Sequence, residues 1–121
     1  MSSPTARSLQ NLRDNGWTCA VVEHWNPYAH IRQDLFGVID ILAMKEGCGL
    51  YAIQATTTGN MGARITKSLA EPRLRTWLLC GGRFAVWGWA KRGVRGKRKV
   101  WTQAIREITS KDFESLPDTV L

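Results

Sequence analysis

The pattern of hydrophobic and polar positions in the first half of the chain predicts one helix followed by three strands. Leu9 and Leu12 share one helix face, Ser3-Pro4 is a typical helix start, and Asn15-Gly16 is a typical stop. The apolar runs that follow are short, as in buried strands. The predicted elements are a helix over about 4–14, strands over 17–25, 35–44 and 50–57, a loop over 26–33, and a hairpin turn over 45–49.

The second half of the chain predicts a helix in two pieces and then two more strands. Met61, Ile65 and Leu69 recur at helical spacing after a capping segment, Thr58-Gly59-Asn60. Pro72 restarts the helix, and two consecutive glycines stop the second piece. The remaining predicted elements are strands over 83–90 and 100–108, a basic loop over 91–99, and a short helical turn from Ser110.

The order of these elements, α-β-β-β-α-β-β, predicts an α/β domain of the α+β kind, with a central mixed sheet flanked by helices. A chain of 121 residues has room for one domain, 1–121, with one core. Its six tryptophans are many for this length, and most are expected to fill the core. Trp87 and Trp89 alternate onto one strand face, where core packing is favoured over stacking on unpaired bases.

Membrane and secreted classes are excluded by the same pattern. No apolar run approaches the ~18 residues needed to cross a bilayer, and the N-terminus lacks the layout of a secretory signal. The cysteines, Cys19, Cys48 and Cys80, are far apart and have no metal-ligand spacing. We expect free thiols, a cytoplasmic location and no membrane partner.

The formal net charge of +7 is concentrated in one stretch. Residues 72–106 hold ten lysines and arginines and no carboxylate, whereas residues 1–71 balance at zero and residues 107–121 at −3. Such a segregated basic region favours a phosphate backbone as its partner, with a merely solvated basic surface as the alternative. The residues expected to bind nucleic acid are Lys91, Arg92, Arg95, Lys97, Arg98 and Lys99 of the loop, together with Arg64.

Three polar residues, Glu23, Asp40 and Gln54, lie where strand interiors should be apolar. If the hairpin turns about Gly47, paired positions sum to 94, so Asp40 and Gln54 lie opposite each other with Cβ atoms about 4.5–5.5 Å apart. Oxygen ligands that converge in this way suit a hard divalent cation, and Glu23 could add a third. A structural hydrogen bond between Asp40 and Gln54 explains the pair equally well, so both interpretations stay open.

Five short stretches, taken in order and spacing, carry a resemblance that covers roughly residues 5–108. They are Glu23-His24-Trp25-Asn26-Pro27, Arg32-Gln33-Asp34-Leu35-Phe36-Gly37, Asp40-Ile41-Leu42-Ala43, Ile53-Gln54-Ala55-Thr56-Thr57 and Trp87-Gly88-Trp89-Ala90-Lys91. Together they resemble the restriction-endonuclease-like PD-(D/E)xK nucleases, in particular small phage-associated members described as Holliday-junction-resolvase-like. The resemblance implies a restriction-endonuclease-like core, and the composition of residues 109–121 predicts a polar tail after it.

The implied activity is that of a Mg²⁺- or Mn²⁺-dependent DNA endonuclease acting on branched or structured DNA. A homodimer and a phage or prokaryotic origin are implied as well. Position by position, Glu23 matches the family's first acid, Asp40 its central aspartate, and Gln54-Ala55-Thr56 its (D/E)xK. The implied metal ligands are therefore Glu23, Asp40 and Gln54.

The sequence departs from the family pattern at its last motif. Gln54 still offers a carbonyl oxygen, but Thr56 cannot supply the positive charge of the motif lysine. Lys67 or Arg64 on the following helix is the candidate substitute, which makes the catalytic set Glu23, Asp40, Gln54, Thr56 and Lys67. The alternative function is a nuclease fold that binds DNA without cutting it. Asp34 has two interpretations as well, a place in the metal site or an ion pair with Arg32.

Overall fold

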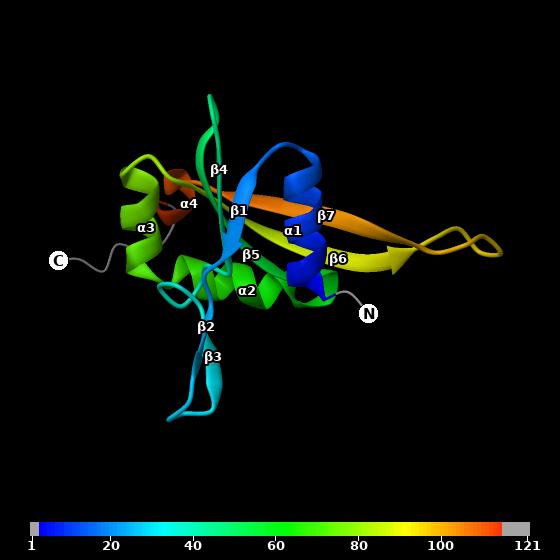
Figure 1. The fold of residues 1–121 in the computed structure, drawn as a ribbon, viewed down its shortest axis with the longest axis horizontal. Helices are drawn as coiled ribbons and strands as arrows, with labels where there is room; N and C mark the ends of the chain where they lie inside the picture. Colours follow the sequence, from blue (N-terminus) through cyan, green and yellow to red (C-terminus); the bar gives the residue numbers. More distant parts are fainter. Residues whose placement is uncertain (1–2, 115–121) are drawn as a thin grey trace.

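The fold is built on a five-stranded mixed sheet with strand order β1-β4-β5-β6-β7 (Figure 1). The computed structural model describes residues 3–114. The strands are β1 (Thr18–Val21), β4 (Ile41–Lys45), β5 (Gly49–Thr57), β6 (Arg83–Arg92) and β7 (Val100–Ile108). Within this sheet β5 and β6 run parallel, and the other neighbouring pairs are antiparallel. The predicted α+β class with a mixed sheet is confirmed.

Helices cover the two faces of the sheet unequally. They are α1 (Pro4–Asp14), the 3₁₀ turn η1 (Thr58–Asn60), α2 (Met61–Leu69), α3 (Pro72–Leu79) and α4 (Ser110–Glu114). One core cluster joins Leu12 of α1 to the strands, and a second joins the strands to Leu74 of α3 and the apolar side of α2. Among residues 3–114, no helix is long and apolar enough to cross a membrane.

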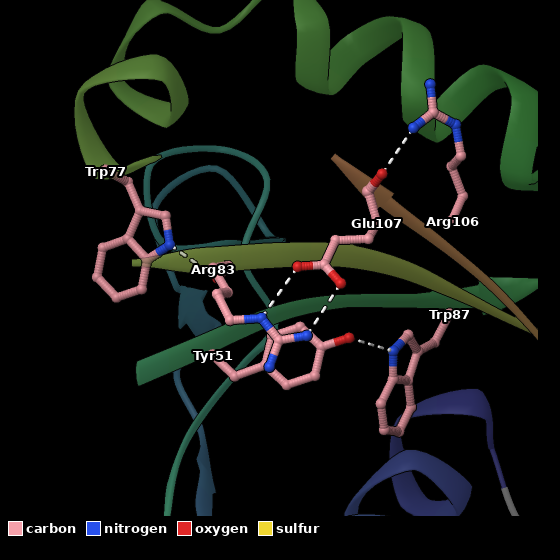
Figure 2. A network of polar contacts seen from close by, with 6 residues as sticks. All are labelled: Tyr51, Trp77, Arg83, Trp87, Arg106 and Glu107. Atoms are coloured by element: carbon pink, nitrogen blue, oxygen red, sulfur yellow. Dashed lines mark hydrogen bonds and ion pairs between the residues drawn. The ribbon is translucent and has the colours of Figure 1, made fainter. Parts of the chain in front are cut away.

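The tryptophans of β6 belong to the core face under α1. Trp87 is 4% exposed and donates its indole N–H to the Tyr51 hydroxyl at 3.2 Å (Figure 2). Trp89 is 8% exposed and donates to the Ser8 hydroxyl at 2.9 Å. Core packing is therefore confirmed for both, because their polar edges are satisfied inside the protein.

The predicted helix boundaries are largely confirmed. The Ser3 hydroxyl accepts a hydrogen bond from the Ala6 N–H at 3.1 Å, and Gly16 takes a φ of 85° after the last turn of α1. The start of α2 differs from the prediction. The segment before it forms η1, and Asn60 makes no side-chain capping bond.

The predicted strand over 17–25 is confirmed only for its first part, and the predicted loop over 26–33 is wrong. The main sheet keeps only β1, and the chain then forms a separate two-stranded hairpin of β2 (His24–Asn26) and β3 (Ile31–Gln33), which projects from the domain (Figure 1). The Asn26 side-chain oxygen accepts hydrogen bonds from two backbone N–H groups just beyond it, at 2.9 and 3.1 Å. This Asx turn reverses the chain, so the segment pairs with itself and leaves the main sheet.

The predicted strand over 35–44 begins later than expected. Phe36 and Gly37 have positive φ values of 54° and 78°, and the Leu35 N–H donates to the Ile39 carbonyl at 2.9 Å. This tight turn buries two apolar side chains, Val38 and Ile39, without extending the strand. The strand β4 therefore starts only after Asp40.

β6 and β7 form a long ribbon whose ends differ. At one end the Arg83 guanidinium makes two hydrogen bonds to the Glu107 carboxylate, at 3.0 and 2.9 Å (Figure 2). At the other end β6 runs two residues further than predicted, so Lys91 and Arg92 belong to the strand and the loop spans 93–99. This end extends beyond the rest of the molecule (Figure 1).

The packing of β6 against η1 and α2 predicts an effect of Gly88→Ala. An added Cβ would overlap the Met61 sulfur and would lie 3.0 Å from the Thr58 Cα. Such overpacking should lower the free energy of unfolding by about 1–3 kcal/mol, measured by urea denaturation. Gly59→Ala is the matched control, because nothing lies within 4 Å of its added Cβ. Equal stability of the two variants would contradict this packing.

Candidate metal centre in a charged cleft

Three carboxylates converge at the base of the β2–β3 hairpin. Glu23, Asp34 and Asp40 each place one oxygen within 4.8 Å of the other two. Glu23 lies between β1 and β2, Asp34 directly after β3, and Asp40 directly before β4. Each of the three carboxylates thus lies at a position where the chain enters or leaves a strand.

Strand register explains this convergence. In the hairpin, paired positions sum to 57, as in His24 with Gln33, so one further step in the same register places Glu23 opposite Asp34. The Val22 N–H donates to the Asp40 carbonyl at 2.8 Å, which continues the β1–β4 ladder by one residue. Glu23 therefore follows a residue that is paired with Asp40. Both carboxylate neighbours of Glu23 are set by backbone pairing alone.

Gln54 closes the cluster from β5. The β4–β5 register sums to 94 as predicted over residues 41–45, but Asp40 itself lies just before the paired residues and donates its N–H to the Ile53 carbonyl at 2.9 Å. The Gln54 side-chain N–H group donates to Asp34 at 3.1 Å and to Asp40 at 3.4 Å. The Ala55 backbone N–H also donates to the Asp40 carboxylate, at 2.8 Å. Asp40 is thus held from two sides.

Gln54 is only 2% exposed, and its side-chain amide oxygen has no hydrogen-bond partner among residues 3–114. A buried carbonyl oxygen is normally satisfied. Rotation of the amide by 180° exchanges its nitrogen and oxygen and turns the oxygen toward the carboxylates. The side chain therefore has one orientation in which its N–H group donates to the carboxylates and another in which its oxygen would face a cation.

Burial raises the pKa values of two of the carboxylates, those of Asp40 and Glu23. Burial, helped by hydrogen bonding to Asp34, raises the pKa of Asp40 to about 8. Burial and the negative charge of Asp34 also raise the pKa of Glu23. Near neutral pH the cluster accordingly holds a proton when no cation balances its charge.

The cluster opens into a cleft of about 670 Å³ that also carries positive charge. Arg64 and Lys67, one turn apart on α2, line it together with Arg32 and Arg73. Arg32 lies 3.6 Å from Glu23, whereas Arg73 forms a two-pronged ion pair with Glu71. Within the described range 3–114, Arg64 and Lys67 are the cations of the cleft that form no ion pair.

The structure brings most of the residues expected in the catalytic and metal set together. Glu23, Asp40, Gln54 and Lys67 line the cleft, as does Arg64. Thr56 does not, and it is only 5% exposed. The expectation that Glu23 lies inside a strand is wrong, because the chain leaves the main sheet just before it.

The structure separates the two interpretations of Asp34. Its carboxylate belongs to the cluster, while Arg32 pairs with Glu23 instead. The residues between Asp34 and Asp40 form a turn, so the two do not lie on one continuous strand. The register of β2 with β3 is what places Asp34 near Glu23. The sequence prediction missed this because it assigned residues 26–33 to a loop, in which no strands pair.

The basic residues of the ribbon lie outside the cleft. Lys91, Arg92, Arg95, Lys97, Arg98 and Lys99 are all exposed and form no ion pair within the described part of the chain. The expectation of a wholly uncompensated stretch over 72–106 is wrong at three positions. Arg73, Arg83 and Arg106 pair with carboxylates just beyond its limits, those of Glu71, Glu107 and Asp112.

Comparison with protein-family models, curated proteins and solved structures gives no match, so the chemistry of the site is inferred from its own geometry.

The raised pKa of Asp40 predicts how stability depends on pH. The folded pKa of about 8 exceeds the ordinary value of 3.8, so the folded state binds more protons between these limits. Without metal, the free energy of unfolding should therefore fall as pH rises from about 4 to 8. Asp40→Asn should flatten this fall in a series of thermal melts in chelator.

Glu46→Gln is the control for that series, because Glu46 is an exposed carboxylate in the turn between β4 and β5. Its melting temperatures should follow the wild-type slope with pH. Parallel slopes for wild type and Asp40→Asn would show that the buried carboxylate does not hold the proton.

Proposed function

We propose that this protein is a divalent-metal-dependent DNA endonuclease of the PD-(D/E)xK type. The observation that carries the proposal is the convergence of Glu23, Asp34, Asp40 and Gln54 in a cleft that also presents Arg64 and Lys67. Acidic ligands for a cation beside cations for a phosphate are the two requirements of metal-assisted phosphodiester hydrolysis.

The donor set fits a hard cation. Mg²⁺ takes oxygen ligands at about 2.1 Å, so opposite ligands lie about 4.2 Å apart. The three carboxylate oxygens lie within 4.8 Å of one another, which is slightly wider than that span. The unpartnered oxygen of Gln54 supplies a neutral fourth donor after rotation of its amide. Glu23, Asp34, Asp40 and Gln54 are therefore the residues that would hold Mg²⁺ or Mn²⁺.

Bound there, the cation would supply Lewis-acid stabilisation of a scissile phosphate and lower the pKa of a coordinated water. The chain's own groups prepare that step. The Ala55 N–H fixes the Asp40 carboxylate at 2.8 Å, and Arg64 and Lys67 bind the phosphate from α2. Lys67 takes the part of the lysine missing at position 56, stabilising negative charge as it develops.

The exposed end of the β6–β7 ribbon adds a second, weaker kind of contact in this proposal. Its six lysines and arginines lie outside the cleft, so they bind neighbouring phosphates and take no part in chemistry. The glycines of the loop let its backbone approach a phosphate closely. We therefore expect substitutions in the carboxylate cluster to affect cleavage, and substitutions in the ribbon to affect DNA binding.

Substitution in the cluster should abolish cleavage while leaving binding intact. Asp40→Ala and Gln54→Leu should remove Mg²⁺- or Mn²⁺-dependent nicking of plasmid and junction DNA, with DNA affinity within a few-fold of wild type. Gln54→Glu should preserve cleavage, because it restores a carboxylate ligand at that position. The assay is a cleavage time course at saturating DNA, with Glu46→Gln as the control.

Nicking by Asp40→Ala at the wild-type rate would contradict the assignment of the site. Tight DNA binding by a wild-type protein that cuts no substrate would favour the alternative function, a nuclease fold that only binds DNA.

The ribbon should instead set the salt dependence of binding. Neutralising Lys97, Arg98 and Lys99 together should weaken binding similarly on two unrelated duplexes. It should also flatten the slope of log K against log salt by up to ~0.9 for each phosphate that the variant no longer neutralises. Cleavage should recover at saturating DNA, because these side chains bind the ground state and the transition state alike.

The control for the ribbon neutralises three exposed cations elsewhere, Arg13, Arg75 and Lys111. Its salt slope should stay at the wild-type value. An unchanged slope in the ribbon variant would place this loop away from the DNA, and weaker binding to only one duplex would indicate base readout.

A further inference from the structure

The β2–β3 hairpin exposes large aromatic and apolar side chains to solvent. Trp25 is 54% exposed, Tyr28 95% and Ile31 49%. The hairpin forms a two-stranded sheet of its own and projects from the domain (Figure 1). Large apolar side chains gathered on such a projection usually mark a binding site.

The hairpin is also a wall of the cleft. His24, Ile31 and Arg32 line the same cleft as the carboxylate cluster. Trp25 and Arg32 are directly paired across the hairpin, so they share one face. An aromatic ring beside a guanidinium is a combination that binds a base together with its phosphate.

Phe36, which lines the cleft itself, has a strained backbone conformation. Phe36 has a φ of 54°, a conformation that aromatic residues rarely adopt, and it is 37% exposed. The Arg73 guanidinium lies 5.4 Å from the centre of its ring. Strained backbone of this kind concentrates at functional sites, because the surrounding structure has to hold it.

The charges of the cleft indicate which kind of partner binds beside the exposed rings of Trp25 and Tyr28. Arg64 and Lys67 suit phosphates, and the carboxylates beside them suit a cation that bridges to phosphate. A paired duplex hides the faces of its bases in the stack. Only unpaired nucleotides can offer base faces to Trp25 and Tyr28 while their backbone enters the cleft.

We propose that the β2–β3 hairpin recognises unpaired nucleotides of DNA, with Trp25 and Tyr28 stacking on bases while the cleft holds the adjoining phosphate. This inference rests on the proposed function and names its substrate class, duplex DNA that carries a single-stranded gap or flap. Arg32 contacts the same strand from the face that it shares with Trp25.

The test compares two labelled DNAs in chelator, where no cleavage can occur. One is a fully paired duplex, and the other is the same duplex with a short single-stranded gap. Fluorescence anisotropy should show that wild type prefers the gapped DNA. Tyr28→Ala and Trp25→Ala should each reduce that preference by roughly tenfold, while affinity for the paired duplex changes little.

Conservative variants and a distant control sharpen the result. Tyr28→Phe should keep the preference, because the ring remains. Leu79→Ala, at an apolar residue that is 59% exposed on α3, should keep it too. Tyr28 is 95% exposed, so its replacement leaves the fold intact, as circular dichroism should verify.

Equal binding of gapped and paired DNA by wild type would overturn the proposal, as would an unchanged preference in the Trp25→Ala, Tyr28→Ala double variant. These outcomes are distinct from failure of the nuclease assignment. A protein that cuts DNA without preferring gaps retains the proposed function and loses this inference. A protein that prefers gaps but never cuts retains the hairpin's role and loses the nuclease.

Discussion

Asp40 is only 4% exposed, and one of its carboxylate oxygens lies within 4.8 Å of oxygens of two other carboxylates. Buried like charges are unstable together, so the group must share a proton or meet a cation. The Ala55 N–H holds one side of this carboxylate, and the Gln54 amide reaches it from the other. In the function that we propose, the charge of Asp40 is balanced in one of two ways, by a proton or by a bound cation.

The β2–β3 hairpin, and not the main sheet, brings Glu23 and Asp34 close together. Had β1 continued to Trp25, Glu23 would have remained in a ladder and Asp34 in a distant loop. The Asx turn at Asn26 folds the segment back, and its register sets Glu23 against Asp34 at the edge of the cleft. One local turn thus brings Glu23 close to Asp34 and also leaves Trp25 and Tyr28 exposed to solvent.

The parts of the site that depend on one hairpin turn are predictable from the sequence. The glycine-rich turn over 45–49 determines the β4–β5 register, and with it the proximity of Gln54 to Asp40, which lies just before the paired residues. Strand alternation correctly predicts that both tryptophans of β6 lie in the core. The helices around Pro72 follow from helical spacing and the missing N–H of proline.

The features that sequence patterns do not predict depend on contacts between distant or competing segments. The polar segment 26–33 has loop composition, and its pairing depends on an asparagine side chain that no periodicity reveals. The turn at Phe36 resembles a strand because its residues are apolar. The ion pair of Arg83 with Glu107 joins two strands at positions 24 residues apart, so counting charges within 72–106 does not reveal it.

The central claim is that Glu23, Asp34, Asp40 and Gln54 together hold a divalent cation. Crystals grown above pH 8 and soaked in Mn²⁺ would test it most directly, because the pKa of Asp40 is about 8 and its proton is then largely lost. We expect one anomalous peak among the four side chains, with the Gln54 amide rotated so that its oxygen faces the ion. Continued direct hydrogen bonding of Gln54 to both aspartates, with no peak between the carboxylates, would contradict the claim.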